Sequence, residues 1–238
     1  MPVAIITGAS RGLGAALALE LDRRGWELVV DARGAEALAA TPGHRVPGDV
    51  TDPRHRHELA ETAARLGGAH LLVNNASTLG ASPMPAVADL PEDTLLHALT
   101  TNVVAAHELT RLLLPQLLAH RGTVVNLSSD AAVEPYEGWG AYGASKAALD
   151  HLTRILAAEQ PTLAVYAVDP GDMRTRMHQD AFPGEDISDR PEPGTVVPHL
   201  LGLLETRPAS GRYRAADLPV VEPFVEPVVE PVVEGATS

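Results

Sequence analysis

The sequence predicts an α/β fold, in which a doubly wound parallel sheet of about seven strands has helices on both faces. Apolar runs with the length of strands alternate with helical patterns along the 238 residues, which is typical of a parallel sheet. The runs contain few polar residues, as expected for strands that are covered on both faces. Right-handed crossovers then produce a sheet whose ligands bind beyond the carboxyl ends of its strands.

Each element follows from a local pattern in the sequence. The strands are expected at Val3–Thr7, Trp26–Asp31, His44–Pro47, Ala69–Val73, Thr123–Leu127, Leu163–Val168 and Arg212–Ala215. The helices are expected at Gly12–Arg24, Pro53–Leu66, Pro91–His120, Ala141–Glu159 and Thr195–Glu205. Asp52 is a suitable N-cap for the second helix, and Pro115 is expected to bend the third helix or to end its first part. The segment Asp172–Arg190 is polar and interrupted by Pro and Gly, which indicates a mobile flap.

The chain is expected to form a single domain over residues 1–217, followed by a tail over residues 218–238. From Val221 onward the tetrad Val-Glu-Pro-x recurs. Proline at every fourth residue excludes helix interiors and central strands. We therefore expect the tail to be extended or disordered, and its composition fits a solvated segment better than a partner-binding one.

The composition excludes several classes of function. Acidic residues outnumber basic ones by 31 to 18, and a net negative surface disfavours nucleic acid and anionic lipid as partners. The sequence lacks a signal-peptide pattern and a stretch of about 20 apolar residues that would span a membrane, so a cytoplasmic protein is expected. Cysteine is absent, which excludes thiolate chemistry. His55 and His57 do not converge on a helix, so we expect no metal site and interpret the histidines as surface residues.

Lysine and asparagine are rare in this sequence. Only one of the 18 basic residues is lysine, Lys146, and the four asparagines are Asn74, Asn75, Asn102 and Asn126. A chain rich in Ala, Arg, Gly and Pro avoids these two types. We therefore expect them at positions where the chemistry accepts no substitute.

A glycine-rich segment joins the first expected strand to the first expected helix. Glycines there permit a tight turn and a close approach of the backbone, and the helix N-terminus offers N–H groups to a phosphate. The spacing Gly-x-x-x-Gly-x-Gly differs from the usual Gly-x-Gly-x-x-Gly, but its place between strand and helix favours a dinucleotide site. The residues expected to bind the cofactor here are Gly8, Ser10, Arg11, Gly12, Leu13 and Gly14.

The form of the dinucleotide depends on the residues after the second strand. Arg11 and Arg33 favour a 2′-phosphate, and thus NADP(H) over NAD(H), whereas an acid such as Asp31 would favour a free ribose diol. Asp31 lies two residues before Arg33, so the two side chains are also able to pair with each other.

Two further strand ends are expected to contribute to the cofactor site. Asp49 and Val50 follow the third strand and are expected to frame the adenine, although Asp49 also suits a turn before Asp52. Asn75 and Ala76 follow the fourth strand and are expected to support the wall of the cofactor site, with the amide holding the neighbouring loop.

The most specific pattern combines Ser129, Tyr142, Lys146 and Asn102. Tyr142 and Lys146 are four residues apart near the start of a helix, so they lie on one face. A nearby ammonium is expected to lower the pKa of the Tyr142 phenol and make it an acid–base group, while Lys146 also binds ribose hydroxyls. Ser129 is placed to donate to a substrate oxygen. Asn102 is placed to hold a water that links Lys146 to solvent.

With these motifs the sequence resembles the short-chain dehydrogenase/reductase family. The matches, in family order, are Thr7–Gly14, Asn74-Asn75-Ala76, Asn102, Ser128-Ser129, Tyr142-x-x-x-Lys146 and Pro170-Gly171-x-x-x-Thr175. The resemblance covers residues 1–215 and implies a Rossmann-type sheet, a nicotinamide cofactor and a Ser–Tyr–Lys–Asn tetrad. It places Pro170 and Gly171 near the nicotinamide, and Thr175 near its amide or the pyrophosphate. It also implies a homodimer or homotetramer formed through the two long helices.

The sequence departs from the family at two positions beside the expected site. Ser77 stands where the family often has glycine, which is expected to shift that loop slightly. Asp130 follows the serine of the tetrad and adds a negative charge.

Aromatic residues in the sequence indicate where the substrate would bind. Tyr136 and Trp139 lie close to Tyr142 in the sequence, and Met173, Met177, His178 and Phe182 belong to the flap. They indicate an aromatic-lined pocket for a small carbonyl or alcohol substrate, with packing against a neighbouring loop as the alternative. Asp130, Glu134 and Glu137 would disfavour an anionic substrate.

The expected function is that of an NADP(H)-preferring oxidoreductase, which interconverts a carbonyl and a secondary alcohol by hydride transfer. One alternative is a catalytically silent dinucleotide-sensing regulatory or scaffold protein, since a fold does not determine a function; a sensor would not need Tyr142 with Lys146. Another alternative is an epimerase or dehydratase on the same fold, which would convert its substrate without net consumption of cofactor.

Overall fold

The computed structural model describes residues 1–222 and contains one parallel sheet of seven strands. Along the sheet the order is β3-β2-β1-β4-β5-β6-β7. The strands are β1 (Val3–Ile6), β2 (Glu27–Ala32), β3 (His44–Pro47), β4 (Ala69–Asn74), β5 (Thr123–Leu127), β6 (Ala164–Asp169) and β7 (Gly211–Arg214). Each is within a few residues of its expected position, and the predicted α/β fold class is confirmed.

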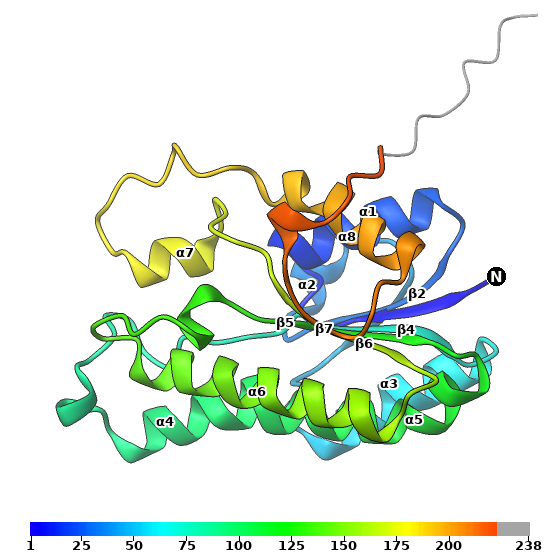
Figure 1. The fold of residues 1–238 in the computed structure, drawn as a ribbon, viewed down its shortest axis with the longest axis horizontal. Coiled ribbons are helices and arrows are strands. Elements are labelled where there is room, and N and C mark those ends of the chain that lie inside the picture. The colour runs from blue at the N-terminus through cyan, green and yellow to red at the C-terminus, as the bar shows by residue number, and fades with distance from the viewer. Residues whose placement is uncertain (223–238) are drawn as a thin grey trace, which may run out of the picture.

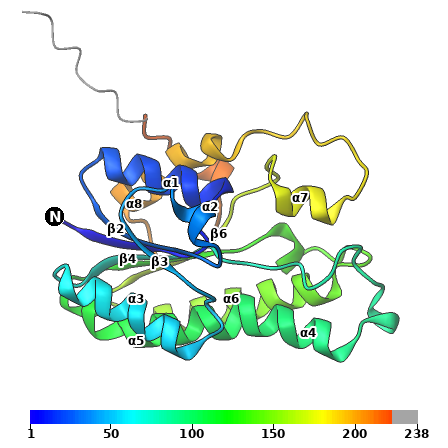
Figure 2. The ribbon, with the colours of Figure 1, turned by 180° about the vertical axis from the view of Figure 1, so that it is seen from behind.

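Helices cover both faces of this sheet (Figures 1 and 2). The layer that contains α3, α4, α5 and α6 lies on one face, and α1, α2, α7 and α8 lie on the other. The helices are α1 (Gly12–Arg23), α2 (Ala35–Leu38), α3 (Pro53–Arg65), α4 (Glu92–Leu99), α5 (Ala105–Ala119), α6 (Gly140–Glu159), α7 (Arg176–Ala181) and α8 (Val197–Thr206). Within residues 1–222 no helix has the length and apolar character needed to cross a membrane.

The sheet separates two hydrophobic cores. Ile6 packs with Leu17 of α1 and Leu200 of α8, whereas Ile5 packs with Leu59 of α3 and Leu113 of α5. Neighbouring residues of β1 thus enter opposite cores because side chains alternate along a strand. This explains why the strands appear in the sequence as apolar runs without alternation.

The centre of the sheet is also the point where its winding reverses. β1 pairs with β2 on one side and with β4 on the other, and all of these pairings are parallel. The connections therefore leave β1 and β4 toward opposite faces, which opens a crevice at their carboxyl ends. The glycine segment follows β1, so it lies at this crevice.

The long helical stretch expected over Pro91–His120 is confirmed, because α4, η2 (Thr100–Val104) and α5 follow one another without a gap. The turn η2 within it is π-helical. Pro115 lies inside α5, so it does not end a helical segment, and the other expectation, that it bends the helix, stays a prediction. Asn102, whose hydrogen bonds are described below, lies in the π-helical turn.

Two predictions concern the C-terminal part of the chain, namely the flap and the tail. The expected flap contains the short helix α7, for which Thr175 is the N-cap and accepts a hydrogen bond from the backbone N–H of His178. In the segment expected to be a tail, Leu218 is buried and the N–H of Val221 donates to the carbonyl of Pro198. Residues 223–238, with most of the Val-Glu-Pro repeat, lie outside the described residues.

Candidate active site

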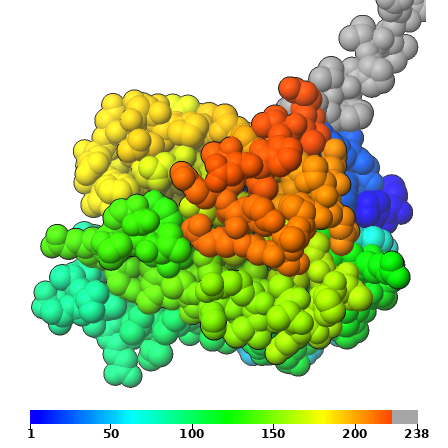
Figure 3. Space-filling model, in the orientation of Figure 1, coloured from blue at the N-terminus to red at the C-terminus, as the bar shows by residue number. Residues whose placement is uncertain are grey.

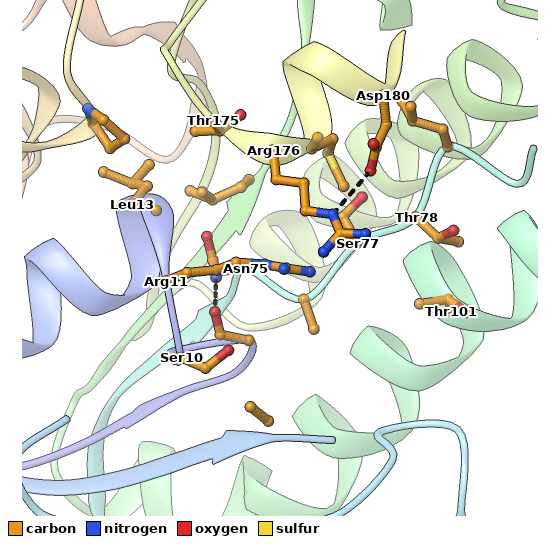
Figure 4. A pocket seen from close by; sticks show the side chains of 18 of the residues that line it. Ser10, Arg11, Leu13, Asn75, Ser77, Thr78, Thr101, Thr175, Arg176 and Asp180 are labelled. Carbon is orange, nitrogen blue, oxygen red and sulfur yellow. Dashed lines mark hydrogen bonds and ion pairs between the residues drawn. The ribbon is translucent and has the colours of Figure 1, made fainter. Parts of the chain in front are cut away.

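A cleft of about 860 Å³ lies at the carboxyl ends of the central strands, a size typical of cofactor and small-molecule sites. Most residues expected to bind the cofactor line it: Gly8, Ser10, Arg11, Gly12, Leu13, Arg33, Asp49, Val50, Asn75, Ala76, Tyr142, Lys146, Pro170 and Thr175. Figure 4 shows Ser10, Arg11 and Leu13 on one side of this cleft and Arg176 and Asp180 on another. Of the residues expected at the cofactor, Gly14 and Gly171 are not part of its wall.

The glycine segment forms a cradle that no larger residue would fit. Gly8 has φ +66°, and a Cβ on it would lie 2.9 Å from the Cα of Ala76. The Asn75 amide donates to the carbonyls of Thr7 (2.7 Å) and Gly8 (3.0 Å), which confirms that it holds the neighbouring loop. A Cβ on Gly14 would lie 2.5 Å from that same amide. Gly14 thus supports the cradle from behind.

The N-terminus of α1 opens into this cradle. Arg11 is the N-cap residue and its side chain does not cap the helix, so the backbone N–H groups of the first turn are not used by a side-chain cap. Unpaired N–H groups and the helix dipole together bind phosphate. The cradle, the uncapped helix and the size of the cleft fit a nicotinamide dinucleotide.

Asp31 is bonded to the glycine segment and is among the residues that line the cleft. It is 1% exposed, and its carboxylate accepts hydrogen bonds from the N–H of Gly8 (2.7 Å) and from the Nε2 of His55 (2.9 Å). Burial raises the pKa of Asp31, and the bonds from His55 and Gly8 oppose this rise. Asp31 therefore does not pair with Arg33, as the sequence had suggested, and His55 is buried rather than a surface residue.

Asp49 forms the turn before Asp52, which was the alternative to a role beside the adenine. Its Oδ1 accepts from the N–H and the hydroxyl of Thr51, and its carbonyl accepts from the N–H of Asp52. Asp52 in turn caps α3 by accepting from the N–H of Arg54. Asp49 and Val50 also line the cleft, so the turn places both of them at its far end.

Ser129, Tyr142 and Lys146 converge where β5 meets α6. Ser129 follows β5, and Tyr142 and Lys146 lie one turn apart near the start of α6. Both α6 side chains are buried. The Lys146 Nζ lies 5.4 Å from the centre of the Tyr142 ring and donates to the carbonyl of Leu127 at 2.7 Å. Their convergence on one helix face agrees with the sequence-based expectation.

The electrostatics of this cluster differ from the expectation. Burial raises the pKa of Tyr142 to about 12, with further increases from Asp130 and Asp169, while contact with the Ser129 hydroxyl opposes the rise. Burial also lowers the pKa of Lys146 to about 8. The prediction that Lys146 lowers the pKa of the phenol is wrong for this structure, because desolvation of the phenolate outweighs the attraction of an ammonium that is bonded elsewhere.

The side chain of Asn102 holds the loop that follows β4. In η2 its Oδ1 accepts from the N–H of Thr78 (2.8 Å) and the hydroxyl of Ser77 (3.1 Å). Its Nδ2 donates to the carbonyl of Thr78 (2.9 Å) and to the Oγ of Ser145 (2.8 Å). Both amide hydrogens are used within the protein, and the expected water relay stays a prediction. The side chain joins the segment after β4 to α6, and Ser77 is part of this contact.

A smaller pocket of about 100 Å³ lies beside Tyr142, on the side where the sequence predicts the substrate. Leu79, Trp139 and Met177 line it together with Gly171 and Asp130. Trp139 also packs against Tyr142, Tyr136 and Phe182, at ring distances of 5.7, 6.0 and 5.8 Å. The aromatic residues therefore both line the pocket and pack against the α7 segment. In the space-filling view this segment, in yellow, stands above the green segment near residues 130–140 (Figure 3).

Several residues of the cleft were not singled out in the sequence. Thr101 of η2, Arg176 of α7 and Pro193 and Gly194 after the flap line it. Arg176 forms an ion pair with Asp180 at 3.8 Å (Figure 4). Arg176 directly follows Thr175 of the matched motif, and this position could have identified it from the sequence. Thr101 lies in η2, and Pro193 and Gly194 lie in the 3-10 helix η4 (Pro193–Val196). The positions of these two elements beside the cleft depend on tertiary packing.

Comparisons with known proteins agree with this geometry. The model of the short chain dehydrogenase family matches residues 2–186. Sepiapterin reductase from Xenopus laevis is 36% identical over 222 residues, covering 81% of this chain and 84% of that protein. Serine 3-dehydrogenase from Agrobacterium fabrum is 36% identical over 181 residues, covering 72% of each. A solved short chain dehydrogenase from Shigella flexneri, complexed with NADP, superposes with a TM-score of 0.83 at 27% identity, covering 90% of this chain and 97% of that one.

The chain belongs to the short-chain dehydrogenase/reductase family and is an oxidoreductase of that family. The family binds NAD(P), in agreement with the cradle at the N-terminus of α1.

Proposed function

We propose that the protein is an NADP(H)-preferring oxidoreductase that interconverts a small carbonyl compound and a secondary alcohol. The observation that carries the proposal is the convergence of Ser129, Tyr142 and Lys146 at the edge of the glycine cradle. The names of two relatives, a serine 3-dehydrogenase and a sepiapterin reductase, support chemistry at an alcohol or a carbonyl carbon.

The cofactor would lie along the cleft from the adenine end to Tyr142. Asp49 and Val50 would hold the adenine end, the uncapped turn of α1 the pyrophosphate, and Pro170 with Thr175 the nicotinamide end. When bound, the cofactor supplies the hydride.

The chain's own residues handle the proton. A phenol whose pKa is raised to about 12 by burial remains protonated at neutral pH, so Tyr142 is suited to donate its proton to the oxygen of a carbonyl substrate. The Ser129 hydroxyl donates to Asp130 at 3.0 Å in this structure, and because a hydroxyl has one proton it would turn from Asp130 to the substrate oxygen as negative charge develops there. Lys146 lies one helical turn from Tyr142 and remains largely protonated at neutral pH, because its pKa is about 8.

Two arginines support the preference for NADP(H). Arg11 and Arg33 both line the cleft and are exposed, so their guanidinium groups are available to a 2′-phosphate. Asp31, the acid that would favour NAD(H), is engaged by Gly8 and His55. The ribose end of the cleft is thus lined by cations.

Replacing Arg33 by alanine should weaken binding of NADPH far more than binding of NADH. Loss of one charge-assisted contact to phosphate corresponds to about 10- to 100-fold in the dissociation constant. Isothermal titration of both cofactors measures this ratio. Arg23→Ala, at the opposite end of α1, is the matched control and should change neither affinity. Equal losses for the two cofactors would disprove the role in 2′-phosphate recognition.

The function itself is tested by following nicotinamide absorbance with both cofactors and a diverse set of carbonyl compounds and alcohols. We expect oxidation of NADPH by at least one carbonyl compound. Cofactor binding without turnover across the set would favour the regulatory or scaffold alternative. Conversion of a substrate without net change in cofactor would favour an epimerase or dehydratase.

We also propose that the protein is a homodimer or homotetramer formed through the α4–α5 and α6 helices. Leu96 of α4, Val104 of η2 and Ile155 of α6 are 52%, 48% and 39% exposed. Large apolar side chains in such positions suit an interface between copies of the chain.

A further inference from the structure

Asp130 is held rigidly beside Ser129 by three hydrogen bonds. Its Oδ1 accepts from the Ser129 hydroxyl (3.0 Å) and the Ala131 N–H (2.8 Å). Its Oδ2 accepts from the Tyr136 hydroxyl at 2.8 Å. These bonds use both carboxylate oxygens, so the negative charge has a fixed position next to the serine proposed to bind the substrate oxygen.

Asp130 also lines the substrate pocket beside Tyr142. No ion pair joins it to a basic side chain within residues 1–222, whereas the other acid that acts on Tyr142, Asp169, is paired with Arg212 at 3.4 Å. The remaining cation near the phenol, Lys146, is bonded to the backbone. The charge of Asp130 is therefore the one left uncompensated at this end of the pocket.

Other charged groups lie around this pocket besides Asp130. Asp172 and His178 line the same pocket and face each other at 3.8 Å. Glu134 lies in the Asp130 loop and, like Asp130 and Asp172, raises the pKa of Tyr136, whose largest cause of shift is the bond to Asp130. Arg190 lies 3.7 Å from Asp172 and Arg212 donates to the Ser129 carbonyl at 2.9 Å. Of the acids that line the pocket, Asp130 is thus the one that no basic side chain pairs within residues 1–222, and its carboxylate accepts from the Ser129 hydroxyl.

We propose that Asp130 is a specificity-determining residue, which makes the pocket select carbonyl substrates that are neutral or cationic near the reacting group over carboxylates. The inference rests on the proposed function, since it takes Ser129 and Tyr142 as the groups that meet the substrate oxygen. Asp130 is exposed, so a carboxylate placed beside that oxygen would be repelled by a like charge that solvent partly screens. An ammonium there would be attracted.

Asp130→Asn is the sharpest variant because it removes the charge and keeps the shape. An amide oxygen still accepts from Ser129 and Ala131, and the amide nitrogen still pairs with the Tyr136 oxygen. Glu137→Gln is the matched control, since it removes one negative charge from an exposed residue of the same loop that lines neither pocket.

The first measurement requires no substrate. The Tyr142 phenol is titrated by ultraviolet absorbance, and subtraction of Tyr142→Phe in each background removes the signals of the other tyrosines. Because Asp130 raises the pKa of Tyr142, the phenol should titrate at lower pH in Asp130→Asn and at unchanged pH in Glu137→Gln. A titration that does not move in Asp130→Asn overturns the proposal.

The second measurement compares three ketones of formula CH3–CO–CH2–X: aminoacetone, hydroxyacetone and acetoacetate. Their dissociation constants from the enzyme saturated with oxidised cofactor are measured calorimetrically, so that no turnover is needed. The wild type should bind acetoacetate at least about tenfold more weakly than hydroxyacetone, and Asp130→Asn should remove about tenfold of that difference. An unchanged ratio in Asp130→Asn overturns the proposal.

The two measurements separate this inference from the proposed function. Ordered binding of the ketones without NADPH oxidation by any carbonyl compound would refute the reaction and not the role of Asp130. If none of the three ketones binds, the titration alone decides.

Discussion

Tyr142→Phe is expected to lower turnover by about 10³-fold, because the phenol is the proposed proton donor and general acid–base catalysis contributes roughly 10² to 10⁴. The substitution removes one hydroxyl from a ring that packs against Trp139, so the fold should be retained. The cleft wall that holds the cofactor consists mainly of other residues. The dissociation constant of the cofactor should therefore change by no more than about twofold. Steady-state kinetics and cofactor titration of the same preparation provide both values.

Tyr213→Phe is the matched control for this substitution. It deletes the same atom from an exposed hydroxyl that donates to the Ala209 carbonyl, at the end of the sheet in β7. Its turnover should equal that of the wild type. Normal turnover by Tyr142→Phe would remove Tyr142 from the mechanism, and loss of cofactor binding together with turnover would indicate a structural role.

The sequence predicted the elements and motifs that depend on local chemistry. Apolar runs identify strands covered on both faces, and the glycines after Ile6 identify the cradle because a φ of +66° at Gly8 suits no other residue as well. The four-residue spacing of Tyr142 and Lys146 places them together on any helix. The rare lysine and the asparagines lie at packed positions, where their hydrogen bonds are specific.

What could not be predicted is the direction of side chains that depend on tertiary partners. Asp31 was placed at the correct strand end, but only the sheet and α3 decide that it meets Gly8 and His55 instead of Arg33. Sequence proximity of Lys146 to Tyr142 suggested a lowered pKa, whereas burial dominates. The side chain of Asn102 bonds to Thr78 and Ser145, which are 24 and 43 residues away in the chain, and such partners leave no local signature.

Asn102→Ala is expected to lower both the stability and the turnover of the protein. Asn102 is 2% exposed, and its removal leaves the N–H and the carbonyl of Thr78 and the hydroxyl of Ser145 without this partner. Each unsatisfied buried group costs about 1 to 3 kcal/mol, and partial replacement by water makes a total of about 3 kcal/mol reasonable. For a domain of this size that corresponds to a decrease in melting temperature of about 10 °C. Calorimetry and steady-state kinetics measure the two effects.

Melting temperature and turnover together distinguish two roles of Asn102, a structural clamp and a water-mediated relay to Lys146. If Asn102 acted only by holding a water beside Lys146, Asn102→Ala would lower turnover and leave the melting temperature unchanged. If it clamps the segment after β4 to α6, Asn102→Asp should fall between alanine and wild type, because its carboxylate still accepts from the Thr78 N–H and no longer donates to the Thr78 carbonyl. His107→Ala, an exposed change on α5, should alter neither property. A normal melting temperature for Asn102→Ala would therefore contradict the clamp and support the relay.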